Sequence, residues 1–318
     1  MAFTFDRGRT VQENVRAIAS SQLQSALDVI DDPDLDIHET VHEVRKNCKK
    51  VRGLLRLTRL GAEKLHDREN AALRNAARRI SDLRDLTANL ETVALLENRF
   101  GDALEEELLA RLRKALEERR VVRAAELDSA VRIKKVRREI EATLKRSRDW
   151  KIPGKIPGKG FGALAGGLGK TYKRAVNRMH DAFDEPSSEA WHEWRKRVKY
   201  HRYHTDLLRN MWAPVLDERE AQLHALTDLL GDDNDLGELR RVLREEPRWL
   251  DDNETGSTVV GLIDRLRAEL QGATRPLALR LFAEAPDDLV ARYRSYWQAW
   301  HAGPTEAHEV DPVIHPGG

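Results

Sequence analysis

One eleven-residue pattern occurs twice in this 318-residue chain, and it constrains the fold more than any other feature. Both copies read His-x-x-Arg-Lys-x-x-Lys-x-x-Arg, and they are offset by 192 − 42 = 150 residues. A repeat of this length predicts two halves that are built alike. The matching positions are His42, Arg45, Lys46, Lys49 and Arg52 in the first copy and His192, Arg195, Lys196, Lys199 and Arg202 in the second.

Each copy has the periodicity of an amphipathic helix. At about 100° per residue the five basic groups share an arc of roughly 120° and extend along about 15 Å of helix. Val44, Cys48 and Val51 fall on the opposite side of the first copy, as Trp194 and Val198 do in the second. The pattern therefore predicts two helices, each with an apolar face for the core and a cationic face.

The single sign of this cationic face indicates a function. Like charges three or four residues apart repel each other, whereas a face that only meets solvent usually mixes both signs. Repetition of the same face favours an anion-binding site over a solvated surface. Further candidates for the site are two residues on the first motif helix and a basic stripe before the second motif: Lys50, Arg56, Lys170, Lys173 and Arg174. Because the stripe has little counterpart in the first half, we expect the second half to contribute more of the binding surface.

A second match supports a duplication. Arg84-Asp85-Leu86 and Asn234-Asp235-Leu236 are also offset by 150 residues. Asp85 and Asp235 would repel an anion directly, so we expect them to orient a neighbouring His, Lys or Arg. The alternative is that each is an ordinary aspartate at a helix end or on the surface.

The paired motif, followed by the Asp-Leu repeat, resembles the CHAD domain, the conserved histidine α-helical domain. The resemblance extends from about Thr10 to His301. It implies an all-α fold of two pseudo-twofold-related antiparallel helical bundles, with a basic groove or pore between them. It also implies inorganic polyphosphate as the ligand and, through that binding, association with polyphosphate granules. The residues alone argue only for a polyanion.

Composition limits the other possibilities. The formal net charge is +1, so affinity for a polyanion must come from the placement of charge and not from a generally basic protein. The single cysteine, Cys48, allows no disulfide within the chain and is expected in the core. No apolar run is long enough for a membrane span, and no signal peptide is visible at the N-terminus. We therefore expect a cytoplasmic protein that does not contact membranes.

Proline and glycine punctuate the chain into four segments. We predict a helical bundle over 1–150, a Gly/Pro-rich linker over 151–169, a second bundle over 170–302 and a disordered tail over 303–318. The linker lysines could instead flank a ligand channel. In the first half, helices are expected over 10–30, 35–60, 62–100 and 102–148 (bent or broken). In the second half they are expected over 170–183, from about 188 to 212, from there to 230, and over 257–270 and 275–300.

The sequence argues against three other activities. His38-Glu39-Thr40-Val41-His42 fits the zincin pattern, but the second copy lacks the first histidine and Arg45 would repel a dication. Gly169-Lys170-Thr171 resembles the end of a P-loop, yet Leu164 stands where a glycine is required. An enzyme that acts on phosphate chains would need an acidic cluster to bind Mg²⁺, and the sequence lacks one. We expect a non-enzymatic protein without cofactor or metal; nucleic-acid backbone binding is the alternative, and protein partners are not predicted.

Overall fold

Every regular element in the described part of the chain is a helix. The computed structural model describes residues 3–126, 128–152, 160–250 and 253–302, without side chains for 83–86, 103, 124, 125 and 253–255. The first half comprises α1 (Val11–Asp31), α2 (Ile37–Leu57), α3 (Glu63–Arg79), α4 (Ser81–Phe100), α5 (Glu106–Glu126) and α6 (Ser129–Ser147). The second comprises α7 (Gly162–Asp184), α8 (Ser188–Leu208), α9 (Ala213–Glu245), α10 (Asn253–Leu281) and α11 (Pro286–Ala302). The predicted all-α class is confirmed.

The motif helices begin at local capping signals. Asp36 accepts hydrogen bonds from the backbone N–H groups of His38 and Glu39, which fixes the start of α2. Ser187 accepts a hydrogen bond from the backbone N–H of Ala190, which fixes the start of α8. Both motifs therefore lie on helices of 21 residues.

Several predicted boundaries were wrong. The predicted 62–100 helix is divided between α3 and α4 at Ile80, whereas α9 continues without interruption through Gly231 to Glu245. The predicted break at Gly231 does not occur because this residue is buried inside the helix packing. Similarly, α10 continues through the predicted gap at 271–274 and through Pro276, and the predicted 275–300 helix is divided between α10 and α11. The predicted bent or broken 102–148 region does comprise two helices, α5 and α6.

The start of α7 differs from the predicted linker. This helix begins at Gly162, inside the expected 151–169 segment, and only residues 153–159 of that segment lie outside the described chain. A Cβ atom on Gly167 would lie 2.0 Å from the backbone oxygen of Leu57. The glycines thus let α7 approach the end of α2 more closely than any side chain would permit. The 303–318 tail lies outside the described residues.

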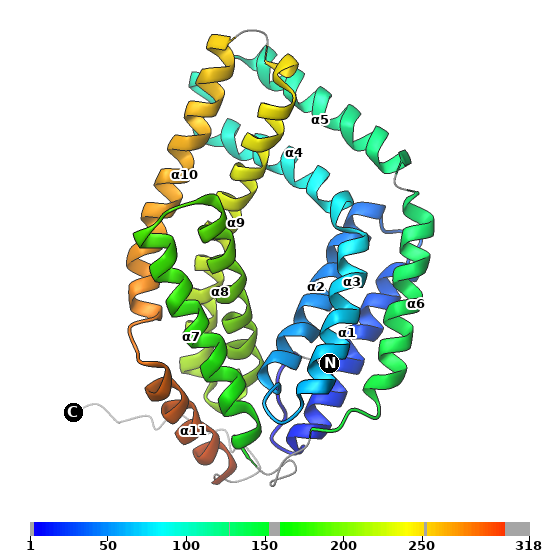
Figure 1. The fold of residues 1–318 in the computed structure, drawn as a ribbon, viewed down its shortest axis with the longest axis vertical. Helices are drawn as coiled ribbons and strands as arrows, with labels where there is room; N and C mark the ends of the chain where they lie inside the picture. The colour runs from blue at the N-terminus through cyan, green and yellow to red at the C-terminus, as the bar shows by residue number, and fades with distance from the viewer. Residues whose placement is uncertain (1–2, 127, 153–159, 251–252, 303–318) are drawn as a thin grey trace, which may run out of the picture.

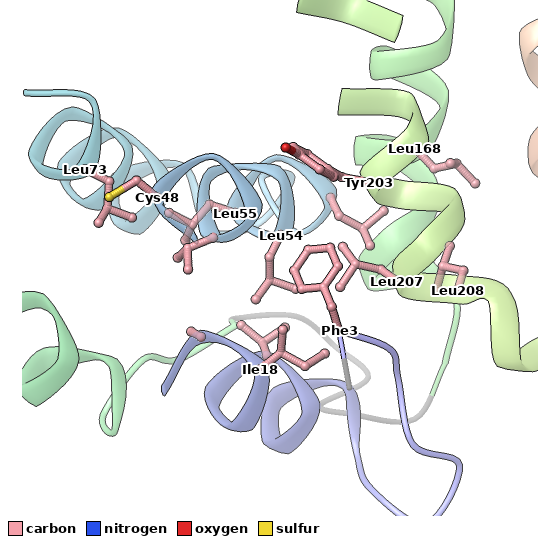
Figure 2. Packing of buried hydrophobic residues seen from close by; sticks show 14 of the residues in the cluster. Phe3, Ile18, Cys48, Leu54, Leu55, Leu73, Leu168, Tyr203, Leu207 and Leu208 are labelled. Carbon is pink, nitrogen blue, oxygen red and sulfur yellow. The ribbon is translucent and has the colours of Figure 1, made fainter. Parts of the chain in front are cut away.

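The two halves share a hydrophobic core. One cluster of buried residues draws on α1, α2, α3, α6, α7, α8, α11 and parts of α9 and α10, and Figure 2 shows Leu54 of α2 close to Phe3 and to Leu207 of α8. Cys48 is buried in this cluster, as predicted, and burial raises the pKa of its thiol to about 12. A second cluster joins α4 and α5 to α9 and α10.

Figure 1 shows how these contacts arrange the helices as a ring. The helices α1, α2, α3 and α6 form one side and α7 to α10 the other, with α4 and α5 crossing between them. The ring is held at two places, where α2 contacts α7 and α8 and where α4 contacts α9 and α10. The pseudo-twofold relation, and the groove or pore between the halves, stay predictions.

Candidate functional site

The two motif helices meet directly. The side chain of Tyr203 packs on Gly53, where an added Cβ would lie 3.0 Å from the ring. One residue further along α8, Nε2 of His204 donates a hydrogen bond of 3.0 Å to the Gly53 carbonyl oxygen. Burial lowers the pKa of His204 to about 3, so this buried ring is neutral. The contact brings the two cationic faces to a common junction.

Lys49 and Lys199, which we name the central lysine pair, lie at this junction. Burial lowers the pKa of Lys49 to about 7, with further lowering by the charges of Lys199, Arg45, Arg195 and Arg52. Burial also lowers the pKa of Lys199 to about 8, together with Arg195 and Arg202 and against the opposing charges of Asp228 and Asp235. Among the described residues, neither ammonium group has an ion-pair or hydrogen-bond partner. The pair is thus a half-buried concentration of positive charge that Asp228 and Asp235 offset only in part, on the Lys199 side.

Arg45 and Arg195 flank the central lysine pair one turn earlier on each helix. Nη1 of Arg45 donates a hydrogen bond of 2.9 Å to the carbonyl oxygen of Ala77, which anchors the side chain to the end of α3. Nε of Arg195 is buried and, within the described part of the chain, has no hydrogen-bond partner. A buried guanidinium N–H without an acceptor is costly and is expected where a ligand supplies one.

Arg52 and Arg56 share an acceptor that the sequence reasoning missed. Oδ1 of Asn70 on α3 accepts hydrogen bonds of 3.0 Å from Nε of Arg52 and from Nη1 of Arg56. The Arg56 guanidinium also lies 3.9 Å from the ring centroid of Tyr200, and burial lowers its pKa to about 10. The neutral amide orients both arginines without cancelling their charge.

The repeat equivalent of Arg52 is Arg202, and a carboxylate neutralises its charge. Nε of Arg202 donates a hydrogen bond of 2.7 Å to the Glu220 carboxylate. The repeat itself holds the signal that could have identified both partners, because 70 + 150 = 220 places Asn70 and Glu220 at matching positions. The prediction that the second half contributes more of the binding surface is not supported by these contacts.

The lysines in the first turn of each motif are paired with acids. Lys46 lies 3.0 Å from the Glu43 carboxylate, and Lys196 makes the matching contact with Glu193. Both pairs are exposed or half-buried, where an ion pair contributes little. These two lysines can still exchange their partner for a ligand. Lys50 differs, because its ammonium lies 5.0 Å from the centroid of the Phe3 ring.

The motif histidines have different surroundings. His42 is exposed, with Nε2 3.9 Å from the Glu43 carboxylate. His192 is half-buried, and its Nδ1 donates a hydrogen bond to Oδ1 of Asn234. Nδ2 of Asn234 in turn donates to Asp235 at 2.9 Å, so Asp235 reaches the histidine through Asn234. Whether this contact orients a ligand-binding group stays a prediction, and the side chain of Asp85 lies outside the described ones.

The predicted stripe on α7 divides. Burial lowers the pKa of Arg174, as do the charges of Arg197, Arg59 and Arg178, so Arg174 belongs to a group of arginines contributed by α7, α8 and the turn after α2. Arg197 and Arg59 were not among the predicted site residues. Lys170 and Lys173 are exposed and have no ion-pair partner among the described residues.

The zincin-like motif does not form a metal site in the described part of the chain. Nδ1 of His38 hydrogen-bonds to the hydroxyl of Thr87 at 2.9 Å. No group of three or more His, Cys, Asp or Glu residues converges there in a way that could hold a metal ion. Across the same described ranges, every helix is too short or too polar to span a bilayer.

The fold and the junction define an all-helical protein with paired basic helix faces. The chain belongs to the CHAD domain family, whose model matches residues 17–244. The crystal structure of the CHAD domain from the plant Ricinus communis is similar in fold, with a TM-score of 0.55 and 17% sequence identity; the match covers 94% of this chain and 95% of that one. A comparison with curated protein sequences gave no match.

Proposed function

We propose that the α2–α8 junction binds inorganic polyphosphate and that the protein acts by binding and not by catalysis. The observation that carries the proposal is the central lysine pair, which is half-buried, is acted on by the charges of four arginines and makes no ion pair among the described residues. Such a grouping is unfavourable in the free protein. A flexible polyanion with a charge on every phosphate would relieve the repulsion at each position that it crosses.

The side chains suit phosphate oxygens. Arginines offer forked pairs of N–H donors that match phosphate geometry, and the lysines supply point charges between them. Asn70 and the Ala77 carbonyl hold three of the arginines in place before any ligand arrives. Preorganisation of this kind lowers the entropy lost on binding.

Nucleic acid is the competing ligand, and the aromatic residues argue against it. Binding of single strands commonly uses exposed aromatic rings on which bases stack. At this junction Arg56 covers the Tyr200 ring, and Tyr203 is buried against Gly53. The surface therefore favours a polyanion that has no bases. Association with polyphosphate granules would follow from the same binding.

The test is a titration of the full chain with long-chain polyphosphate and with single-stranded DNA of matched length, at ~50 and ~200 mM salt. The variant Lys49→Met/Lys199→Met removes the central lysine pair. Lys134→Met/Lys145→Met is the matched control, because it removes two exposed lysines from α6 on the outer side of the first half. The ligand is recovered afterwards and sized, so that any cleavage is detected.

We expect polyphosphate to bind more tightly than DNA and to retain more affinity at the higher salt. The central variant should lose roughly tenfold or more in affinity, and the α6 control should change little. Equal losses in the two variants would reduce the site to non-specific charge attraction. Equal binding of DNA would favour the nucleic-acid alternative, and shortened polyphosphate would show that the protein is an enzyme.

A further inference from the structure

The two halves differ in charge along one edge beside the motif helices. On α3, Asn70, Arg74 and Arg78 follow each other at intervals of four residues, so they lie along one edge of the helix. We call this the α3 edge. The same interval on α9 gives the α9 edge, and each of its members is 150 residues beyond one of the first set: Glu220, His224 and Asp228.

The register between these edges is supported by the core. Leu73 and Leu223 are also 150 residues apart; each directly precedes the middle residue of its edge in sequence, and both are buried. Ile80 and Leu230 are buried in the same way. Since the buried faces of α3 and α9 coincide under the offset, their edges occupy matching positions in the two halves.

The first members of the two edges determine the charge of the adjacent arginine. Asn70 holds Arg52 with a neutral amide at 3.0 Å, whereas Glu220 holds Arg202 with a carboxylate at 2.7 Å. Positions 56 and 206 also match under the offset of 150 residues, and there the first half has the basic Arg56 where the second half has the acidic Asp206. The first half therefore keeps the charge of Arg52, whereas the second half balances the charge of Arg202 with Glu220.

The remaining members extend this difference. Arg74 and Arg78 are exposed, and within the described residues neither guanidinium has a hydrogen-bond or ion-pair partner. On the α9 edge, His224 is paired with Asp228 at 2.7 Å. The charge of Asp228 also acts on Lys199. An anion would be attracted to the first edge and repelled by the second.

We propose that the α3 edge is an additional part of the polyphosphate-binding surface and that the α9 edge is excluded from it. The polymer then lies asymmetrically on the junction, along the α2–α3 side of the central lysine pair, from Arg52 and Arg56 at Asn70 to Arg74 and Arg78 near the Ala77 carbonyl that Arg45 contacts. This inference rests on the proposed function and specifies which half carries most of the polymer.

The experiment compares two double variants at matching positions, in the same polyphosphate titration at ~50 and ~200 mM salt. Arg74→Gln/Arg78→Gln removes the charges of the α3 edge. His224→Gln/Asp228→Asn changes the corresponding residues of the α9 edge. All four positions are exposed, and thermal unfolding of each variant verifies that the fold is retained.

We expect Arg74→Gln/Arg78→Gln to lower the affinity roughly fivefold or more and to reduce the slope of log affinity against log salt by about 1.4, the value for two lost phosphate contacts to a single strand. The α9 variant should bind as tightly as the unmodified protein or more tightly. Unchanged affinity and slope in the α3 variant, or an equal loss in both variants, would overturn the asymmetric path.

Failure of the inference is distinguishable from failure of the proposed function. If polyphosphate binds and Lys49→Met/Lys199→Met abolishes this binding while the α3 variant behaves as unmodified protein, only the asymmetric path is wrong. If the unmodified protein does not bind polyphosphate, the proposed function itself is wrong.

Discussion

The charge of Lys199 on α8 lowers the pKa of Lys49 on α2, although 150 residues separate them in sequence. Each lysine is the repeat equivalent of the other, and the charges of arginines from both motifs lower the pKa of Lys49 further. Their pKa values of about 7 and about 8 lie close to physiological pH. The proposed binding site is therefore coupled to protonation.

Polyphosphate affinity should fall as the pH rises from 7 to 9. The free lysines lose protons in this range, whereas a bound polyanion favours their charged forms, so binding must be accompanied by proton uptake. The groups that act on the pair are Arg45, Arg52, Arg195, Arg202, Asp228 and Asp235. We expect an affinity loss of roughly tenfold or more over these two pH units. Calorimetry in buffers with different ionisation enthalpies measures the proton uptake directly.

The control for this prediction is Lys49→Met/Lys199→Met, whose residual affinity should depend much less on pH between 7 and 9. An equally steep pH profile in that variant would assign the titration to other groups.

Removing the central lysine pair should stabilise the protein in the absence of ligand. The folded-state pKa of each lysine lies below its unfolded value, so the unfolded chain binds more protons and the free energy of unfolding rises with pH through this interval. Replacing both lysines by methionine removes the cost of burying charge, and we expect a gain on the order of 1–3 kcal/mol at pH 7. Urea unfolding at pH 7 and pH 9 measures the effect, and the gain should be smaller at pH 9. A loss of stability at pH 7 would show that the ammonium groups have partners in solution.

The sequence predicted the elements of the site better than their surroundings. The motif helices and their cationic faces follow from local spacing, which the chain reports residue by residue. The division of α3 from α4 and the continuity of α9 depend on what Ile80 and Gly231 pack against, which local propensity does not report. The contrast between Asn70 and Glu220 was present in the repeat, but its meaning required knowing which arginine each one contacts.

The close approach of α7 to α2 makes a sharp prediction about glycine. Gly167→Ala would place a Cβ atom 2.0 Å from a backbone oxygen of Leu57, which cannot move as a side chain can. We expect a loss of more than about 2 kcal/mol in the free energy of unfolding. Gly162→Ala, at the start of the same helix with no atom within 4 Å of the added Cβ, is the matched control and should change stability by less than about 1 kcal/mol. Similar effects at the two positions would mean that α7 does not contact α2 this closely.

Exchanging the residues that hold Arg52 and Arg202 should move affinity in opposite directions. Glu220→Gln leaves Arg202 a hydrogen-bond acceptor but removes the carboxylate that neutralises it, so polyphosphate should bind a few-fold more tightly. Asn70→Glu places a carboxylate beside both Arg52 and Arg56 and should weaken binding by more than Glu220→Gln strengthens it, because one acid then opposes two arginines. Titrations at low salt, where these differences are largest, measure both changes. Asn70→Gln separates charge from shape: it keeps the amide and should bind much more tightly than Asn70→Glu. If Asn70→Gln instead lost as much affinity as Asn70→Glu, the geometry of the asparagine and not the charge at position 70 would control the site.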